Sequence, residues 1–346
     1  MGDTVTRRFG TATIVLTGCL AGCLASGTVG AGVARAAAVR AESPGLKASL
    51  DMAQSRSLTA PETGTCDPSL DTYDRTQLCW RAAATVAVLQ DGTRVGTVTF
   101  DLTHDMRLSP RGRDWAERIT ISAVHATGGT AGMTMTLQAS CGSPCSAADH
   151  FPQGKVITDG LTGVVDYSDA VGAGRTDSAR TVYKLSFVKP GDTPVGFTYQ
   201  TPLSYRCDDA LPGVPAGCVF PAYAPYLATL TTLPAVADDI YAAQGGPGHY
   251  GRPGSGHPLH RVTSLATQAA NYAAVCALSV VGTPPAGQAC DEYPFRSARE
   301  GGTTVSKANR LAAWVPAAQE KAKNSRIASF YDANRVLNGD PFWVEL

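Results

Sequence analysis

The sequence has no excess of either charge, since Lys and Arg together number 29 and Asp and Glu together also number 29. Bulk charge therefore favours no particular partner. Charged residues make up only 17% of the chain and hydrophobic residues 44%, which fits an ordinary compact protein. The length leaves ample room for two domains.

Three familiar kinds of site are missing. No Gly-x-Ser-x-Gly sequence is present, so hydrolysis by a Ser/His/Asp arrangement lacks its usual signature. Cys141 and Cys145 have no second close cysteine pair or histidine pair nearby, which excludes a metal–thiolate site. No histidine occurs between Arg261 and Leu346, so no imidazole base can come from that part of the chain.

The N-terminus reads as an export signal. A positive start is followed by a long uncharged stretch of apolar and small residues, and residues 34–36 offer a small-x-small cleavage site. We therefore expect a signal peptide over residues 1–36, a secreted protein and no membrane span in the mature chain. Cys19 and Cys23 each end a sequence that resembles the bacterial lipoprotein box, so lipid anchoring at the cell surface is the alternative.

The cysteines support export. Ten are present, and eight remain when the two inside the signal are set aside. An even number in an exported protein predicts disulfides. The eight fall into four pairs that are close in sequence, so local pairing is the simplest expectation. These pairs are Cys66 with Cys79, Cys141 with Cys145, Cys207 with Cys218, and Cys276 with Cys290.

The segment after the signal has two patterns. Residues 37–64 lack periodicity and predict a flexible leader. Residues 65–240 contain short alternating segments separated by Gly and Pro turns, with a favoured hairpin turn at Asp91-Gly92. This region predicts an all-β antiparallel, sandwich-like domain of unknown role. Its histidines are expected at the surface or in turns: His104, His125 and His150.

A change of composition separates the last quarter of the chain. Residues 241–256 are rich in Gly and Pro and predict a linker. Beyond it, residues 257–346 predict a small α+β domain. Residues 264–278 fit a helix with Ser264 as its N-cap, residues 317–331 fit a second helix, and a strand closes the chain.

An acidic run in this last domain is the most informative feature. Residues 290–295 read Cys-Asp-Glu-Tyr-Pro-Phe, and Glu300 follows beside a Gly-Gly bend. Asp291, Glu292 and Glu300 thus place three carboxylates close to turn-forming residues. Such a concentration suits binding of a hard divalent cation or holding of a general base.

The acidic run closely resembles the signature of the NucA/NucB family of secreted bacterial deoxyribonucleases. The resemblance extends from about residue 250 to residue 346, because further segments match in the same order. They are residues 257–263, 268–276, 314–319, 330–336 and 339–344. The resemblance implies a fold of the ββα-metal nuclease type and an endonuclease that cuts DNA without sequence preference. It also implies a divalent cation, Mg²⁺ or Mn²⁺.

The resemblance gives roles to individual residues. In this family an acidic residue stands where related folds use histidine as general base, and Asp291 takes that position. Glu292 would orient water or the metal ion, and Glu300 is a further candidate ligand. Cys276 and Cys290 would form a disulfide next to the acidic run and stabilise a small domain.

The metal ligand is where the sequence departs from the family. Glu320 stands at the position where the family usually has asparagine, and the family's glycine position falls on Asn324. Glu320 binds the cation directly, or the helix shifts so that Asn324 serves, or the domain is a weak or inactive relative that only binds. The remaining alternative is that Glu320 is a solvated residue between surface lysines.

Several cations are expected to contact DNA phosphates. Arg261 lies inside a matched segment, and Arg296 and Arg299 flank the acidic run. The domain has a modest surplus of Lys and Arg, which fits non-specific contact with the DNA backbone and supplies no base-reading element. We expect a monomer.

Overall fold

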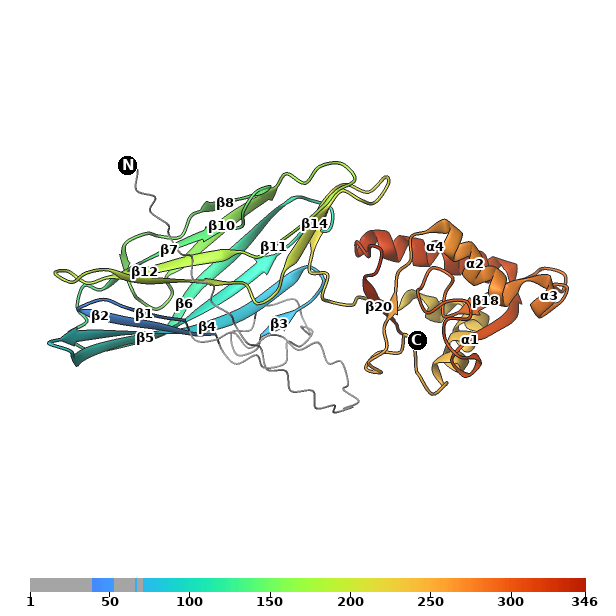
Figure 1. Ribbon diagram of the computed structural model, residues 1–346, viewed down its shortest axis with the longest axis horizontal. Helices are drawn as coiled ribbons and strands as arrows, with labels where there is room; N and C mark the ends of the chain where they lie inside the picture. The colour runs from blue at the N-terminus through green and yellow to red at the C-terminus, as the bar shows by residue number, and fades with distance from the viewer. Residues whose placement is uncertain (1–38, 53–65, 67–70) are drawn as a thin grey trace, which may run out of the picture. The chain divides into compact units, whose positions relative to one another are not determined.

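The computed structural model describes residues 39–52, 66 and 71–346 (Figure 1). The expected signal peptide, with Cys19 and Cys23, lies outside these residues. The described chain contains a β-rich region followed by a small α+β region, as expected.

A curled antiparallel sheet is the largest element of the β-rich region (Figure 1). Its strands lie in the order β1-β2-β4-β5-β6-β10-β8, and β3 pairs with β4. The bounds are β1 Val39–Glu42, β2 Leu46–Met52, β3 Thr72–Tyr73, β4 Gln77–Gln90, β5 Thr93–Arg107, β6 Asp114–Gly128, β8 Cys145–Asp149 and β10 Thr162–Asp169. Asp91 and Gly92 have positive φ angles of 49° and 76°, which confirms the expected tight turn between β4 and β5.

Two smaller sheets complete this region. One has the strand order β13-β12-β7-β9 and the other β11-β14-β15. Their bounds are β7 Thr134–Ser140, β9 Lys155–Val156, β11 Thr176–Ala179, β12 Val182–Val188, β13 Val195–Gln200, β14 Tyr205–Asp208 and β15 Gly217–Val219. Apolar residues alternate along these strands, and one buried cluster contains residues of all three sheets. Phe100 of β5 and Phe187 of β12 meet in it, with ring centroids 6.0 Å apart.

The prediction for His104 was wrong. Its side chain is fully buried, and its Nδ1 lies 2.7 Å from Glu117 Oε1. The hydroxyls of Tyr167 and Tyr183 each donate to Glu117 at 2.6 Å, and the ring of Trp80 stacks on His104. The alternating strand places His104 on the inner face, where Glu117 satisfies Nδ1 and the Tyr199 hydroxyl lies 3.3 Å from Nε2.

The α+β region contains short strands and four α-helices among the described residues. Its elements are β16 Tyr226–Leu227, η1 Thr229–Thr232, α1 Pro234–Gln244, β17 Leu259–His260, α2 Leu265–Cys276, α3 Leu278–Val281, β18 Gln288–Tyr293, η2 Lys307–Asn309, β19 Leu311–Pro316, α4 Ala317–Ala333 and β20 Pro341–Val344. The expected helices correspond to α2 with α3 and to α4. Ser264 is the N-cap of α2, because its side chain accepts a hydrogen bond from the Thr267 backbone N–H at 3.3 Å.

Two segment boundaries expected from the sequence differ from those in the structure. β1 and β2 lie inside the expected leader 37–64, and Leu46 and Leu50 of β2 are fully buried against the sheet. Helix α1 crosses the expected boundary at residue 240. Its apolar side chains share one buried cluster with β20 and α4, so the α+β core begins before the Gly/Pro-rich segment. The Gly and Pro residues of 241–256 form turns in a segment that also packs on this core.

The described cysteines form the four local disulfides that their spacing predicts. The bonds join Cys66 to Cys79, Cys141 to Cys145, Cys207 to Cys218, and Cys276 to Cys290. Among the described residues, no helix has the length and apolar character needed to cross a membrane.

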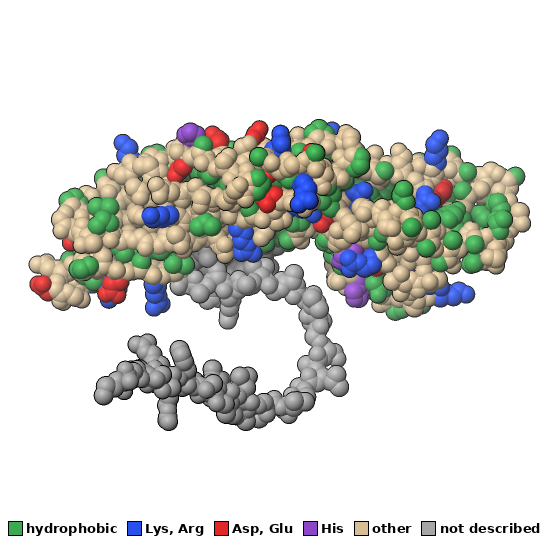
Figure 2. Space-filling model, turned by 45° about the horizontal axis from the view of Figure 1, so that its top comes forward, with side chains coloured by type: hydrophobic (Ala, Val, Ile, Leu, Met, Phe, Trp, Pro, Cys, Tyr) green, Lys and Arg blue, Asp and Glu red, His purple; other side chains and the backbone are tan. Residues whose placement is uncertain are grey.

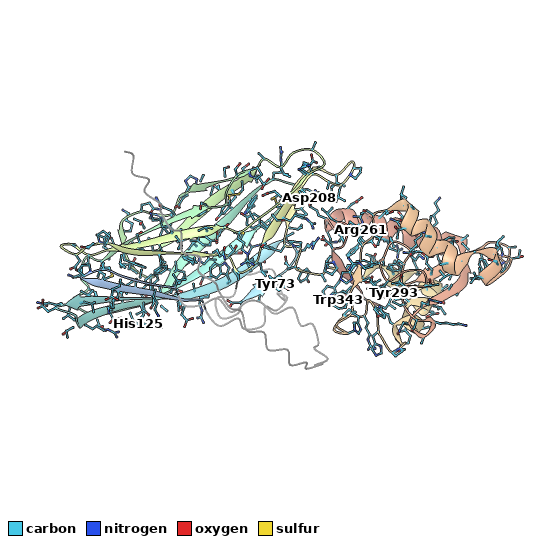
Figure 3. All side chains as sticks on the ribbon, in the orientation of Figure 1. Tyr73, His125, Asp208, Arg261, Tyr293 and Trp343 are labelled. Carbon is cyan, nitrogen blue, oxygen red and sulfur yellow. A yellow bond between two sulfur atoms is a disulfide. The ribbon has the colours of Figure 1, made fainter. Side chains whose placement is uncertain are left out.

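Buried ion pairs connect the β-rich and α+β regions, which belong to one compact unit. Arg75 and Arg206 both donate to the carboxylate of Asp340, at 2.7 and 2.8 Å. In the opposite direction, Arg335 of the α+β region donates through Nε to Asp208 of β14 at 3.1 Å (Figure 3 labels Asp208). Arg335 is fully buried, and its pairing with Asp208 offsets the cost of burying a charged group.

Candidate active site

Two antiparallel strands and the helix after them form the frame of the acidic site. β18 pairs with β19 so that Asp291 lies opposite Ala313 and Glu292 opposite Ala312. Helix α4 begins at Ala317, directly after β19, and its first turns lie against β18. The order strand, strand, helix therefore brings residues of α4 beside the acidic run.

Asp291 and Glu292 are adjacent in β18, yet both are buried, at 1% and 2% exposure. Successive side chains of a strand point to opposite faces. Both can be buried because α1, α2 and α4 all pack on β18. Glu320, in the first turn of α4, completes a group of three carboxylates whose nearest oxygens all lie within 4.8 Å of one another.

Each of these carboxylates has an oxygen without a hydrogen-bonding partner. Asp291 Oδ2, Glu292 Oε2 and Glu320 Oε2 are buried and accept no hydrogen bond of normal geometry. A buried carboxylate is unfavourable unless hydrogen-bond donors or positive charge replace the water that it has lost. The donor set is therefore suited to a cation.

A lysine already provides one positive charge. Lys323, one turn further along α4, is fully buried and forms an ion pair with Asp291. Its Nζ also lies 2.8 Å from Glu320 Oε2 and 3.5 Å from Glu292 Oε2. One ammonium group thus contacts all three carboxylates.

Burial and mutual repulsion shift the proton affinities of the cluster. Burial raises the pKa of Asp291 to about 8, and Glu320 adds to the rise while Lys323 opposes it. Burial also raises the pKa of Glu292, again against Lys323. The pKa of Lys323 lies above its usual range because Glu292, Asp291 and Glu320 together outweigh its burial. Asp291 and Glu292 therefore hold their protons to a higher pH than exposed carboxyl groups do.

A fourth carboxylate comes from α1. Asp239 lies within hydrogen-bonding reach of Asp291, and its Oδ2 is another buried atom without a partner. Burial raises the pKa of Asp239, opposed by the interaction with Asp291 and by the charge of Lys323. The site therefore draws on three elements, α1, β18 and α4.

Comparison with known proteins finds one matching family, and the match lies in the C-terminal segment. Residues 258–345 match the family model described as Deoxyribonuclease NucA/NucB. The C-terminal segment is a NucA/NucB domain. The match includes β18, β19 and α4 but excludes α1, Asp239 and the whole β-rich region. No curated protein and no solved structure matches the chain.

The NucA/NucB domain places Glu320, rather than Asn324, among the acidic residues. Asn324 donates through Nδ2 to Glu320 Oε1 at 2.8 Å and to the Glu320 backbone oxygen at 3.0 Å. The amide therefore orients the carboxylate from one turn away. Glu320 is not a solvated residue, since it is only 7% exposed.

Glu300 does not join the cluster. Its Oε2 accepts a hydrogen bond from the His260 backbone N–H at 2.9 Å, and its Oε1 lies 2.8 Å from His260 Nδ1. The turn before Gly301 carries Glu300 back to β17, so its carboxylate holds that strand. The expectation that Glu300 contributes to the same metal site is thereby corrected.

The three arginines nominated for phosphate differ in their surroundings. Arg261 donates to the Val336 backbone oxygen, and its guanidinium lies 4.4 Å from the Tyr331 ring centroid (Figure 3 labels Arg261). Arg296 lies over the ring of Tyr272 at 5.2 Å, and its positive charge acts on Glu292. Arg299 is exposed. Arg261 is thus mainly a packing residue, and of the three arginines Arg296 is the one whose charge acts on the acidic run.

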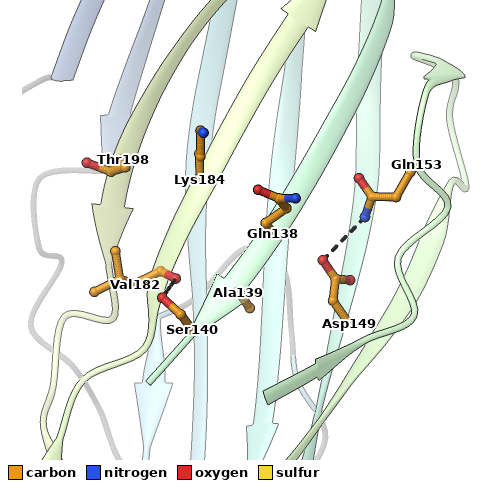
Figure 4. Close-up of a pocket in the computed structure, with 8 residues that line it drawn as sticks. All are labelled: Gln138, Ala139, Ser140, Asp149, Gln153, Val182, Lys184 and Thr198. Carbon is orange, nitrogen blue, oxygen red and sulfur yellow. Dashed lines mark hydrogen bonds between the residues drawn. The ribbon is translucent and has the colours of Figure 1, made fainter. Parts of the chain in front are cut away.

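A polar groove elsewhere contains no part of this cluster. It has a volume of about 600 Å³ and lies on the outer face of β7, β12 and β13 (Figure 4). Gln153 donates to Asp149 at 3.3 Å along its edge. The groove is lined by Gln138, Ala139, Ser140, Asp149, Gln153, Val182, Lys184 and Thr198.

Sequence reasoning missed two members of the site. Lys323 is one of the two lysines beside Glu320 that one reading of the sequence placed at the surface, although its spacing of three residues from Glu320 is that of neighbours on a helix. Asp239 lies outside every matched motif, and nothing in its local sequence distinguishes it from its exposed neighbour Asp238.

Proposed function

We propose that the C-terminal region is a divalent-metal-dependent endonuclease that hydrolyses DNA phosphodiester bonds without sequence preference. The observation that carries this proposal is the set of buried, unpartnered carboxylate oxygens inside the NucA/NucB segment. Such oxygens favour a positively charged ligand. The name of the matching family supports DNA as the substrate.

The donor set fits Mg²⁺ or Mn²⁺, because it consists of carboxylate oxygens and contains no sulfur or imidazole. Glu320 and Glu292 would hold the ion, and Asn324 would keep Glu320 oriented. Such a cation, when bound, neutralises phosphate charge and stabilises the departing oxygen. The arrangement of β18, β19 and α4, with acids on a strand and on the following helix, supports a ββα-metal fold.

Asp291 is the proposed general base. Its raised pKa of about 8 makes the Asp291 carboxylate a stronger base than an ordinary aspartate, and a cation held beside it would favour that charged form near neutral pH. The water oxygen attacks phosphorus while its proton passes to Asp291. The bond to the 3′ oxygen breaks with its electron pair on that oxygen, which takes a proton from solvent water to become a 3′-hydroxyl, and the other strand end carries the 5′-phosphate. Glu292 orients the water.

DNA would bind through its backbone. Arg296 follows β18 directly and is the first candidate for a phosphate contact, with Arg299 beside it. On the face seen in Figure 2, Lys and Arg side chains of the described chain are scattered rather than gathered into one patch. This pattern supports weak, salt-dependent contact with no base-reading element.

We also propose that the protein acts outside the cell as a monomer. The four disulfides support an oxidising compartment. Release after removal of residues 1–36 is favoured, and anchoring through a lipid on Cys19 or Cys23 is the alternative. The β-rich region would serve as a binding, anchoring or folding module.

A second candidate function is a nuclease-like protein that binds without efficient cutting. The observation in its favour is the ammonium of Lys323 within the carboxylate group. The test is nicking of supercoiled plasmid by the purified protein with Mn²⁺ or Mg²⁺ and with EDTA. Nicking that requires the metal supports the enzyme, and DNA binding without nicking supports the binding protein.

A further inference from the structure

Lys323 occupies the position in which a cation is expected. Its side chain is fully buried, and its Nζ lies beside all three carboxylates of the acidic cluster. The distances are 2.8 Å to Glu320 Oε2 and 3.5 Å to Glu292 Oε2. These two oxygens are themselves among the unpartnered atoms that a metal ion would use.

The position is held from several sides. Glu320 and Lys323 lie three residues apart on α4, so they are neighbours on one face of the helix. The ring of Phe295 lies 5.8 Å from Nζ, a distance at which an aromatic face attracts a cation. A buried ammonium is costly unless it is paired, so these contacts keep the lysine in the cluster.

We propose that Lys323 is an internal counter-ion that a divalent cation must displace from the carboxylates. This inference rests on the proposed function and specifies how its metal site is regulated. An ammonium and a metal ion cannot share the Glu320 and Glu292 oxygens at these distances, because like charges repel strongly in a buried site. Lys323 therefore lowers metal affinity, and it keeps the metal-free domain folded.

Removing the ammonium has two opposite effects. Without a metal ion, Lys323→Met leaves the three buried carboxylates without the ammonium that contacts them all, which destabilises the domain. With a metal ion, the competitor is gone, so binding is tighter. A residue that merely stabilised the fold would give the first effect without the second.

The experiment compares Mn²⁺ binding and thermal stability in the full chain. Wild type, Lys323→Met and Lys321→Met are titrated with Mn²⁺ by calorimetry, and their Tm values are measured in EDTA and in saturating Mn²⁺. Lys321 is exposed on the same helix and is the matched control. If Lys323→Met folds poorly without metal, it is prepared in Mn²⁺, and Lys323→Gln provides a second variant of nearly the same length.

We expect both Lys323 variants to bind Mn²⁺ at least tenfold more tightly than wild type. Their Tm should be lower in EDTA and should rise more on metal addition, while Lys321→Met follows wild type. Unchanged or weaker Mn²⁺ binding by both Lys323 variants would overturn the inference, even if wild type nicks DNA with metal. If no protein binds Mn²⁺ or Mg²⁺, the proposed metal-dependent function fails as well.

Discussion

Removal of the Cys276–Cys290 disulfide should destabilise the α+β region and reduce activity with it. The bond joins the last residue of α2 to β18, next to Asp291, and both cysteines are buried. Its sequence separation is 14 residues. In the loop-entropy model a loop of this length contributes about 3 kcal/mol to the free energy of unfolding.

The Cys141–Cys145 disulfide is a matched control. It lies in the β-rich region and closes a separation of only 4 residues. The same model gives it about 2 kcal/mol, and its loss should leave the acidic site unaffected. The double variants Cys276→Ala/Cys290→Ala and Cys141→Ala/Cys145→Ala therefore separate general loss of stability from local damage.

The assay is urea unfolding followed by Trp fluorescence, together with plasmid nicking below the unfolding transition. We expect the Cys276/Cys290 variant to lose about 3 kcal/mol and most of its nicking activity, and the Cys141/Cys145 variant to keep its activity. If loss of Cys276–Cys290 changes the unfolding free energy by less than about 1 kcal/mol, the disulfide has no such supporting role. Nicking at the wild-type rate would show that the Cys276–Cys290 disulfide does not support the acidic site.

Three further changes test other parts of the structure. Glu320→Asn should weaken Mn²⁺ affinity about tenfold or more by removing a charged ligand, as calorimetry would detect. Asp239→Asn should also weaken Mn²⁺ binding, whereas Asp238→Asn at the exposed neighbouring position should not. Equal titration curves for wild type and both variants would exclude Asp239 from the site. Asp340→Asn should cost about 3–5 kcal/mol by leaving buried arginines unpaired, measured by urea unfolding.

The lowered pKa of Asp340 makes the stability of the fold depend on pH. Burial would raise its pKa, but hydrogen bonds and charge from Arg206 and Arg75 lower it below the ordinary value of 3.8. A lowered folded-state pKa means that the stabilisation is present above about pH 4 and is lost as pH falls through the folded pKa. The Asp340→Asn variant should therefore lose less stability than wild type when the pH is lowered from 5 towards 3. Parallel losses would contradict this reading.

Much of the site could be predicted from short sequence patterns. The acidic pair, the helix beginning after Pro316 and the cysteine pairing all depend on local spacing, which a single sequence contains. Glu320 was identified because it broke a family pattern. The acidic pair, the helix start and the cysteine pairing are each determined by residues that lie near one another in the chain.

The remaining features depend on contacts between distant segments. Lysine is almost never fully buried unless paired, so the inward direction of Lys323 could not be expected without knowing that Asp291 lies opposite. Asp239 reaches the site only because α1 packs on β18. β1 and β2 were missed although apolar and polar residues alternate along both, because the strands are short and their order comes from pairing of β1 with β2 and of β2 with β4.

The central claim is that Asp291 is the base of a metal-dependent nuclease, and the most direct test is the nicking rate of Asp291→Asn. Wild type, Asp291→Asn and the exposed control Asp238→Asn are compared on supercoiled plasmid in saturating Mn²⁺, with DNA affinity measured separately in EDTA. We expect Asp291→Asn to lose at least about 100-fold in rate while its fold and DNA affinity stay near wild type. Nicking by Asp291→Asn at a near wild-type rate would contradict the account.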